Sequence, residues 1–146
     1  MKLFTQNKPD IITLTDTYIK NSTDQDIYPL DNYELKHENS ISTYTKKGMN
    51  ITHMEDATIK NAATIIIQIH KNKHKNNPIH TIINIYRRPH RNEITDFIES
   101  LQNTIHNINK KHPKTTITIQ GDLNINLLQL KTRFYHFLIE NNLHTT

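Results

Sequence analysis

A chain of 146 residues is long enough for one domain with its own core and too short for two full domains. It contains no cysteine, which excludes disulfides, thiolate metal sites and cysteine nucleophiles. The net charge of +4 is uneven: residues 1–60 carry seven Lys/Arg against nine Asp/Glu, whereas residues 61–146 carry eleven against five. The basic second half fits a polyanionic partner, although a solvated basic surface explains the charge equally well.

We find no targeting signal in the sequence. No apolar run reaches membrane-spanning length, and the first residues lack the apolar core of a signal peptide. We therefore expect an intracellular protein that does not engage a membrane.

Six short runs have the composition of strands. The run 11–15 follows Pro9-Asp10 directly, and two weaker candidates lie in the polar region between residues 20 and 60. Strands are predicted at residues 11–15, 33–37, 40–45, 62–70, 79–86 and 115–120. The runs 62–70 and 79–86 are apolar at consecutive positions, which predicts burial on both faces and a hairpin with a basic connection.

Two segments have helical patterns. Apolar residues recur at helical spacing from Ile94 to Ile108, with Asn92 as a candidate cap and Pro113 as the stop. The segment from Phe134 to Leu143 is predicted to be a second helix. This order of strands and helices predicts an α/β layered fold in which helices cover at least one sheet.

Polar side chains follow three of the predicted strands. Asp16 follows the first, Tyr86 and Arg87 follow the fifth, and the sequence Gly121-Asp122-Leu123-Asn124 follows the sixth. Carboxylates bind hard divalent cations through oxygen, and such a cation can generate a nucleophile beside a phosphate. The alternative is an ordinary strand exit, because Gly, Asp and Asn are common turn residues.

The ten histidines are interpreted as surface or strand-end residues. The sequence contains no HExxH pattern and no histidine paired at helical spacing with an acid suited to zinc. Among the basic residues, Lys71, Lys73 and Lys75 are interpreted as a solvated hairpin loop, and Arg87 and Arg88 as candidate nucleic-acid contacts.

Three motifs together resemble a known family. The segment from Pro9 to Tyr18, PDIITLTDTY, the segment from Asn84 to Pro89, NIYRRP, and the segment from Ile117 to Asn124, ITIQGDLN, have the order and spacing found in the endonuclease/exonuclease/phosphatase family. They are most similar to the apurinic-type endonuclease domain of non-LTR retrotransposons. The resemblance treats residues 1–146 as a single partial domain that matches the amino-terminal part of the family's domain.

The resemblance implies a four-layer α/β sandwich of the DNase I-like type, incomplete at the carboxyl end, that hydrolyses DNA phosphodiesters with Mg²⁺ or Mn²⁺. Asp16 would bind the metal, Tyr86 would contact the scissile phosphate, Asp122 would align or deprotonate the attacking water, and Asn124 would position it. DNA would be the partner and the nucleus the location, with a longer polyprotein as a possible context.

The sequence also departs from the family. Asp16 stands where the family has glutamate, and the later Ser-x-x-Asp strand and final catalytic histidine have no counterpart in the chain. The alternative function is therefore a non-catalytic remnant that binds nucleic acid through its basic half. We expect Asp16, Tyr86, Asp122 and Asn124 to converge at one end of the sheets, with the two carboxylates close enough to share a metal.

Overall fold

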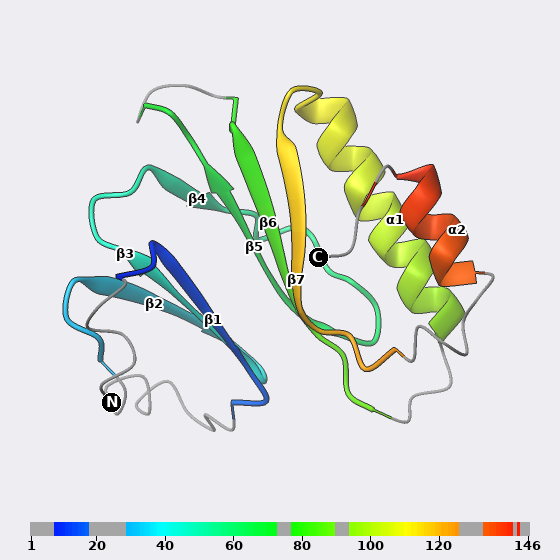
Figure 1. Ribbon diagram of the computed structural model, residues 1–146, viewed down its shortest axis with the longest axis horizontal. Coiled ribbons are helices and arrows are strands. Elements are labelled where there is room, and N and C mark those ends of the chain that lie inside the picture. Colours follow the sequence, from blue (N-terminus) through cyan, green and yellow to red (C-terminus); the bar gives the residue numbers. More distant parts are fainter. Residues whose placement is uncertain are drawn as a thin grey trace.

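The computed structural model describes residues 8–17, 29–72, 77–89, 94–125, 133–141 and 143. Two sheets and a helical layer are stacked side by side in this part of the chain (Figure 1). The elements are β1 (Ile11–Thr15), β2 (Tyr33–Glu38), β3 (Ile41–Lys46), β4 (Ile51–His53), β5 (Ala63–Ile69), β6 (His80–Tyr86), α1 (Ile94–Lys111), β7 (Thr116–Asp122) and α2 (Arg133–Glu140).

The smaller sheet has three strands in the order β1-β3-β2, and both pairings are antiparallel. The strands β2 and β3 form a local hairpin, whereas β1 comes from earlier in the chain and occupies the other edge. Strand β1 ends at Thr15, and Asp16 follows it directly at that end of the sheet.

The larger sheet has four strands in the order β4-β5-β6-β7. The strands β5 and β6 pair antiparallel, as the predicted hairpin requires, and residues 81–86 of β6 are all buried. Helix α1 is the crossover that allows β7 to lie parallel to β6. As a result, β6 and β7 end at the same edge of the sheet, with Tyr86 opposite Asp122.

The two faces of the four-stranded sheet have different covers. On one face, α1 packs Phe97 and Leu101, both fully buried, against a cluster that includes Ile83 and Ile85. The second helix joins this cluster through Phe137. The three-stranded sheet covers the other face through a separate, smaller cluster, whose buried members are Ile41, Ile65, Ile67, Ile82 and Tyr86. The layers are therefore helices, four-stranded sheet and three-stranded sheet.

The α/β layered architecture predicted from the sequence is confirmed at this level. Strand β4 was not predicted, and the proposed cap at Asn92 lies outside the described residues. In the described part of the chain, both helices lie on the four-stranded sheet, so three layers are seen there.

Candidate functional site at the strand ends

Three strands from two sheets bring their carboxyl ends together. The parallel register of β6 and β7 sets Tyr86 beside Asp122. Across the gap between the sheets, the Tyr86 hydroxyl donates a hydrogen bond of 2.9 Å to Oδ1 of Asp16. The structure thus brings Asp16, Tyr86 and Asp122 together at one end of the sheets. Each belongs to a different one of the three motifs, and they are separated by up to about a hundred positions in the chain.

Asp16 leaves β1 through a tight bend. Its φ of 57° lies in the left-handed region, which Asp tolerates better than most residues. The next residue, Thr17, donates its backbone N–H to the carbonyl of Ser40 at 3.1 Å, which fixes the exit of β1 beside the β2–β3 turn. The Asp16 side chain is exposed, so its carboxylate is available to solvent and to ligands.

Gly121 is required where β7 approaches β6. Its φ is 126°, and a Cβ at this position would lie 1.9 Å from the carbonyl oxygen of Ile85. Only glycine allows this close approach. Asp122 follows in an exposed position, and its Oδ1 accepts a 3.0 Å hydrogen bond from the backbone N–H of Asn124. The glycine and the turn together set the direction of the Asp122 carboxylate.

Asn124 joins the exits of β6 and β7. Its side-chain amide donates to the carbonyl of Arg87 at 2.7 Å, and the Arg87 guanidinium donates in return to the carbonyl of Asn124 at 3.3 Å. The backbone N–H of Arg87 also donates to the carbonyl of Asp122 at 2.9 Å. In this structure, Asn124 therefore holds the two strand ends together, which keeps Asp122 beside Tyr86.

The two arginines that follow Tyr86 lie in different environments, and one assignment is corrected. Arg87 is 4% exposed, and its guanidinium carbon lies 5.7 Å from the centre of the Phe97 ring on the helix-covered face. A residue in this position cannot reach a nucleic-acid backbone, so Arg87 is a structural residue. Arg88 is exposed and remains a candidate contact.

A buried polar group that the sequence analysis missed lies beneath the strand ends. Asn84 is fully buried, and its Oδ1 accepts hydrogen bonds from Thr13 Oγ1 at 2.6 Å and from Gln120 Nε2 at 2.7 Å. The available signal was an amide inside the apolar run Ile82-Ile83-Asn84-Ile85. Such a residue must find partners when buried.

The side chains at the strand ends fit a hard divalent cation. Mg²⁺ is commonly bound by one or two carboxylates together with waters and substrate phosphates, and Asp16 and Asp122 supply two exposed carboxylates at one edge. Within the described ranges, no three His, Cys, Asp or Glu side chains are grouped to hold a metal.

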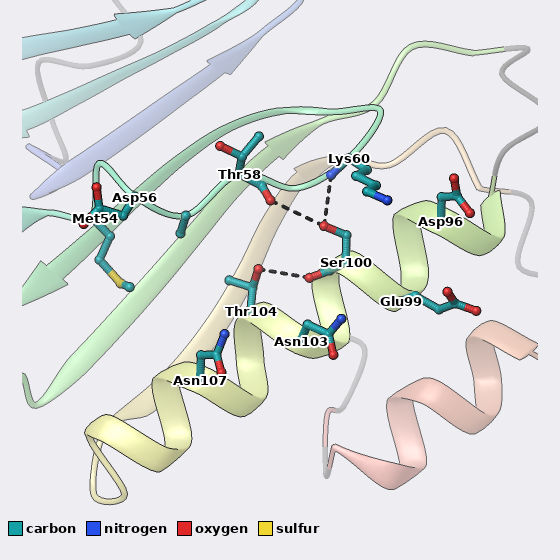
Figure 2. Close-up of a pocket in the computed structure, with 11 residues that line it drawn as sticks. Met54, Asp56, Thr58, Lys60, Asp96, Glu99, Ser100, Asn103, Thr104 and Asn107 are labelled. Carbon is teal, nitrogen blue, oxygen red and sulfur yellow. Dashed lines mark hydrogen bonds between the residues drawn. The ribbon is translucent and has the colours of Figure 1, made fainter.

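A groove of about 440 Å³ lies apart from these residues. It lies between α1 and the segment 54–60, where the Ser100 hydroxyl accepts from the Lys60 N–H at 3.1 Å and donates to the Thr58 carbonyl at 3.4 Å (Figure 2). A second groove, of about 380 Å³, does adjoin the strand ends, because Tyr86 and Arg88 both line it.

Comparisons with known proteins leave the family unassigned, because no model of a known protein family matches the chain and no curated protein matches it either. None of the helices described is long and apolar enough to cross a membrane.

Proposed function

We propose that this chain is a metal-dependent phosphodiesterase domain that cleaves DNA, as its three motifs suggest. The observation that carries the proposal is the hydrogen bond from Tyr86 to Asp16 at the edge where Asp122 pairs with Tyr86. If these residues only ended their strands, they would have no reason to lie close together. Metal-dependent hydrolysis of a phosphodiester, in contrast, needs metal ligands, a proton donor and a water-orienting group at one place. The three layers of the described residues, one of helices and two of sheet, are layers that a four-layer sandwich of the DNase I-like type would also contain.

Each side chain has a distinct role in the proposed reaction. Mg²⁺ or Mn²⁺, when bound, would offset the charge that develops on the phosphate and make a coordinated water more acidic. Asp16 would hold the cation, and Asp122 would orient the attacking water and accept its proton. The Tyr86 hydroxyl, which donates to Asp16 in the structure, donates to a phosphate oxygen when substrate is present. The backbone N–H of Asn124 keeps the carboxylate of Asp122 in place, and the Asn124 side chain ties the exits of β6 and β7 together.

The adjoining groove supports DNA as the substrate. Its lining residues include two cations, Lys60 and Arg88, together with Ser40 and Asn61, and no carboxylate is among them. Cations and neutral hydrogen-bonding groups are the usual contacts for a sugar–phosphate backbone. A strand whose phosphate lies at Tyr86 would continue into this groove.

A plasmid-nicking assay tests the proposal. The wild-type chain should nick supercoiled DNA with Mg²⁺ and stop with EDTA, and Asp122→Asn and Asp16→Asn should each lower the rate by about 10²-fold or more. Asp10→Asn is the matched control, because Asp10 lies exposed at the other end of β1 in a surface ion pair with Lys46. Its rate should equal that of the wild type.

Two results would contradict the proposal. Nicking that persists in EDTA, or that is equal in wild type and Asp122→Asn, would show that the assigned residues are not the active site. Salt-sensitive DNA binding without any metal-dependent nicking would instead favour the non-catalytic nucleic-acid-binding alternative.

A further inference from the structure

Three polar side chains, the buried Asn84 and the half-buried Thr13 and Gln120, form a closed ring between the two sheets. Thr13 Oγ1 and Gln120 Nε2 both donate to Asn84 Oδ1, at 2.6 Å and 2.7 Å, and Gln120 Nε2 also lies 3.0 Å from Thr13 Oγ1. The amide nitrogen of Asn84 donates to the carbonyl of Ile65 at 2.9 Å, which fixes the orientation of the amide. Every polar atom of the Asn84 side chain is thereby used.

The ring lies directly beneath the strand-end residues. In the parallel register, Asn84 pairs with Gln120, and two residues later Tyr86 pairs with Asp122. Residues two apart on a strand share a face and are separated by about 6.6 Å. Thr13 belongs to the third strand, β1, which ends at Asp16. Each strand that supplies one of the proposed reactive residues therefore also supplies one member of the ring.

Stability alone does not explain a polar ring at this position. Burying hydroxyl and amide groups in a sandwich brings little net gain, and well-packed apolar side chains of similar size are often as stable or more so. The neighbouring contacts between the sheets are apolar, through Ile41, Ile65 and Ile82. What hydrogen bonds supply and apolar contacts do not is a fixed direction and a fixed distance between the sheets.

We infer that Thr13, Asn84 and Gln120 are positioning residues, which set the position of β1 relative to β6 and β7 and so hold Asp16 in register with Tyr86 and Asp122. Their importance for metal binding and cleavage rests on the proposed function. The positioning itself is a property of the protein alone and can be measured without metal or DNA.

The principal test replaces the whole ring by apolar side chains of similar size, in the triple variant Thr13→Val, Asn84→Leu and Gln120→Met. Because the three side chains lose their polar groups together, only the Ile65 carbonyl loses a side-chain donor, and the Tm should stay close to that of the wild type. Its dissociation constant for Mn²⁺, measured from the spin-resonance signal of the free ion, should rise at least ~10-fold, as found for lost outer-shell support of metal ligands. Nicking should fall with it.

Two single variants sharpen the test. Thr13→Val removes only the hydroxyl of the ring, and Thr13→Ser retains a hydroxyl, so only the first should weaken Mn²⁺ binding. Thr81→Val is the matched control. The Thr81 hydroxyl lies 3.1 Å from that of Thr115, near the starts of β6 and β7 and therefore at the end of these strands opposite Tyr86 and Asp122. Equal Mn²⁺ affinity in the wild type, Thr13→Val and the triple variant would overturn the inference.

A second measurement separates this inference from the proposed function. In a chain labelled with ¹³C at the tyrosine ζ-carbons, Tyr86→Phe identifies the Tyr86 signal, and Asp16→Asn should shift it because the two side chains are hydrogen-bonded. With the ring replaced, Asp16→Asn should no longer shift that signal. An unchanged shift would overturn the positioning role even if the protein binds metal. If wild type binds no metal and nicks no DNA, loss of the shift would still support the ring as the positioning device.

Discussion

The two faces of the four-stranded sheet are stabilised by different kinds of contact. The helix-covered face is closed by aliphatic and aromatic side chains, with Phe97, Leu101 and Ile85 each fully buried. The face toward the three-stranded sheet combines isoleucines with the polar ring around Asn84. Apolar burial is non-directional and scales with area, whereas hydrogen bonds depend on direction. We interpret the first face as the source of stability and the second as the source of geometry.

The largest effect is expected on the helix-covered face. Phe97→Ala leaves a cavity against the sheet and removes the ring beneath the Arg87 guanidinium. It should lower the free energy of unfolding by about 3–5 kcal/mol, which urea denaturation followed by circular dichroism would measure. A loss below about 1 kcal/mol would show that this face is not the main source of stability.

Gly121→Ala tests the seam between β6 and β7, which lies between the two faces. The added Cβ would collide with the carbonyl of Ile85, and the backbone conformation is one that alanine rarely adopts. We expect a loss of about 3 kcal/mol from strain and overpacking, again measured with urea. Gly48→Ala is the control, because a Cβ there would meet nothing within 4 Å, although its φ of 89° also carries strain. If the two variants lose equal stability, backbone strain alone and not the close approach would explain the cost.

Asn84→Leu alone distinguishes directional from non-directional contacts on the second face. It leaves the half-buried Thr13 hydroxyl and Gln120 amide without their shared acceptor, which should cost about 1–2 kcal/mol in the free energy of unfolding. The fully apolar triple variant should be more stable than this single variant, although it carries two more substitutions. The opposite order of stability would mean that packing, and not hydrogen-bond satisfaction, governs this interface.

The smallest effect is expected from His112 at the end of α1. Burial lowers the pKa of this histidine below its ordinary value, with further lowering by Lys111 and His70. The folded state therefore takes up a proton less readily than the unfolded state, so stability is present above about pH 6.5 and is lost as the pH falls below it. Between pH 7.5 and 5, the Tm of wild type should fall more than that of His112→Leu. Parallel curves would contradict this.

The elements that the sequence predicted best are those with a strong local pattern. Helix α1 has an apolar stripe and a proline stop, and β5 and β6 are rich in β-branched residues, so each is specified by its own residues. Strand β4 contains only Ile51, Thr52 and His53, two of them exposed. Its pairing with β5 comes from tertiary context, which a short polar segment does not reveal.

The candidate site was partly predictable for a related reason. Polar residues at strand ends could be found from the sequence because strand exits have recognisable turn chemistry. The different environments of Arg87 and Arg88 could have been predicted from strand alternation. If the strand pattern continues past Tyr86, Arg87 points to the face opposite Tyr86 and Arg88 points to the same face as Tyr86. The ring could not be predicted, because the partners of Asn84 depend on how two sheets are packed.

The contact between Gln120 and Thr13 also bears on how the protein folds, because it joins residues 107 positions apart. Long sequence separation slows the formation of a contact, so the β2–β3 and β5–β6 hairpins should form well before it. During synthesis, β1 must wait for α1 and β7 to leave the ribosome before its end can meet theirs. The strand ends can therefore assemble only after β7 has emerged, and a nascent chain stays without this site until then.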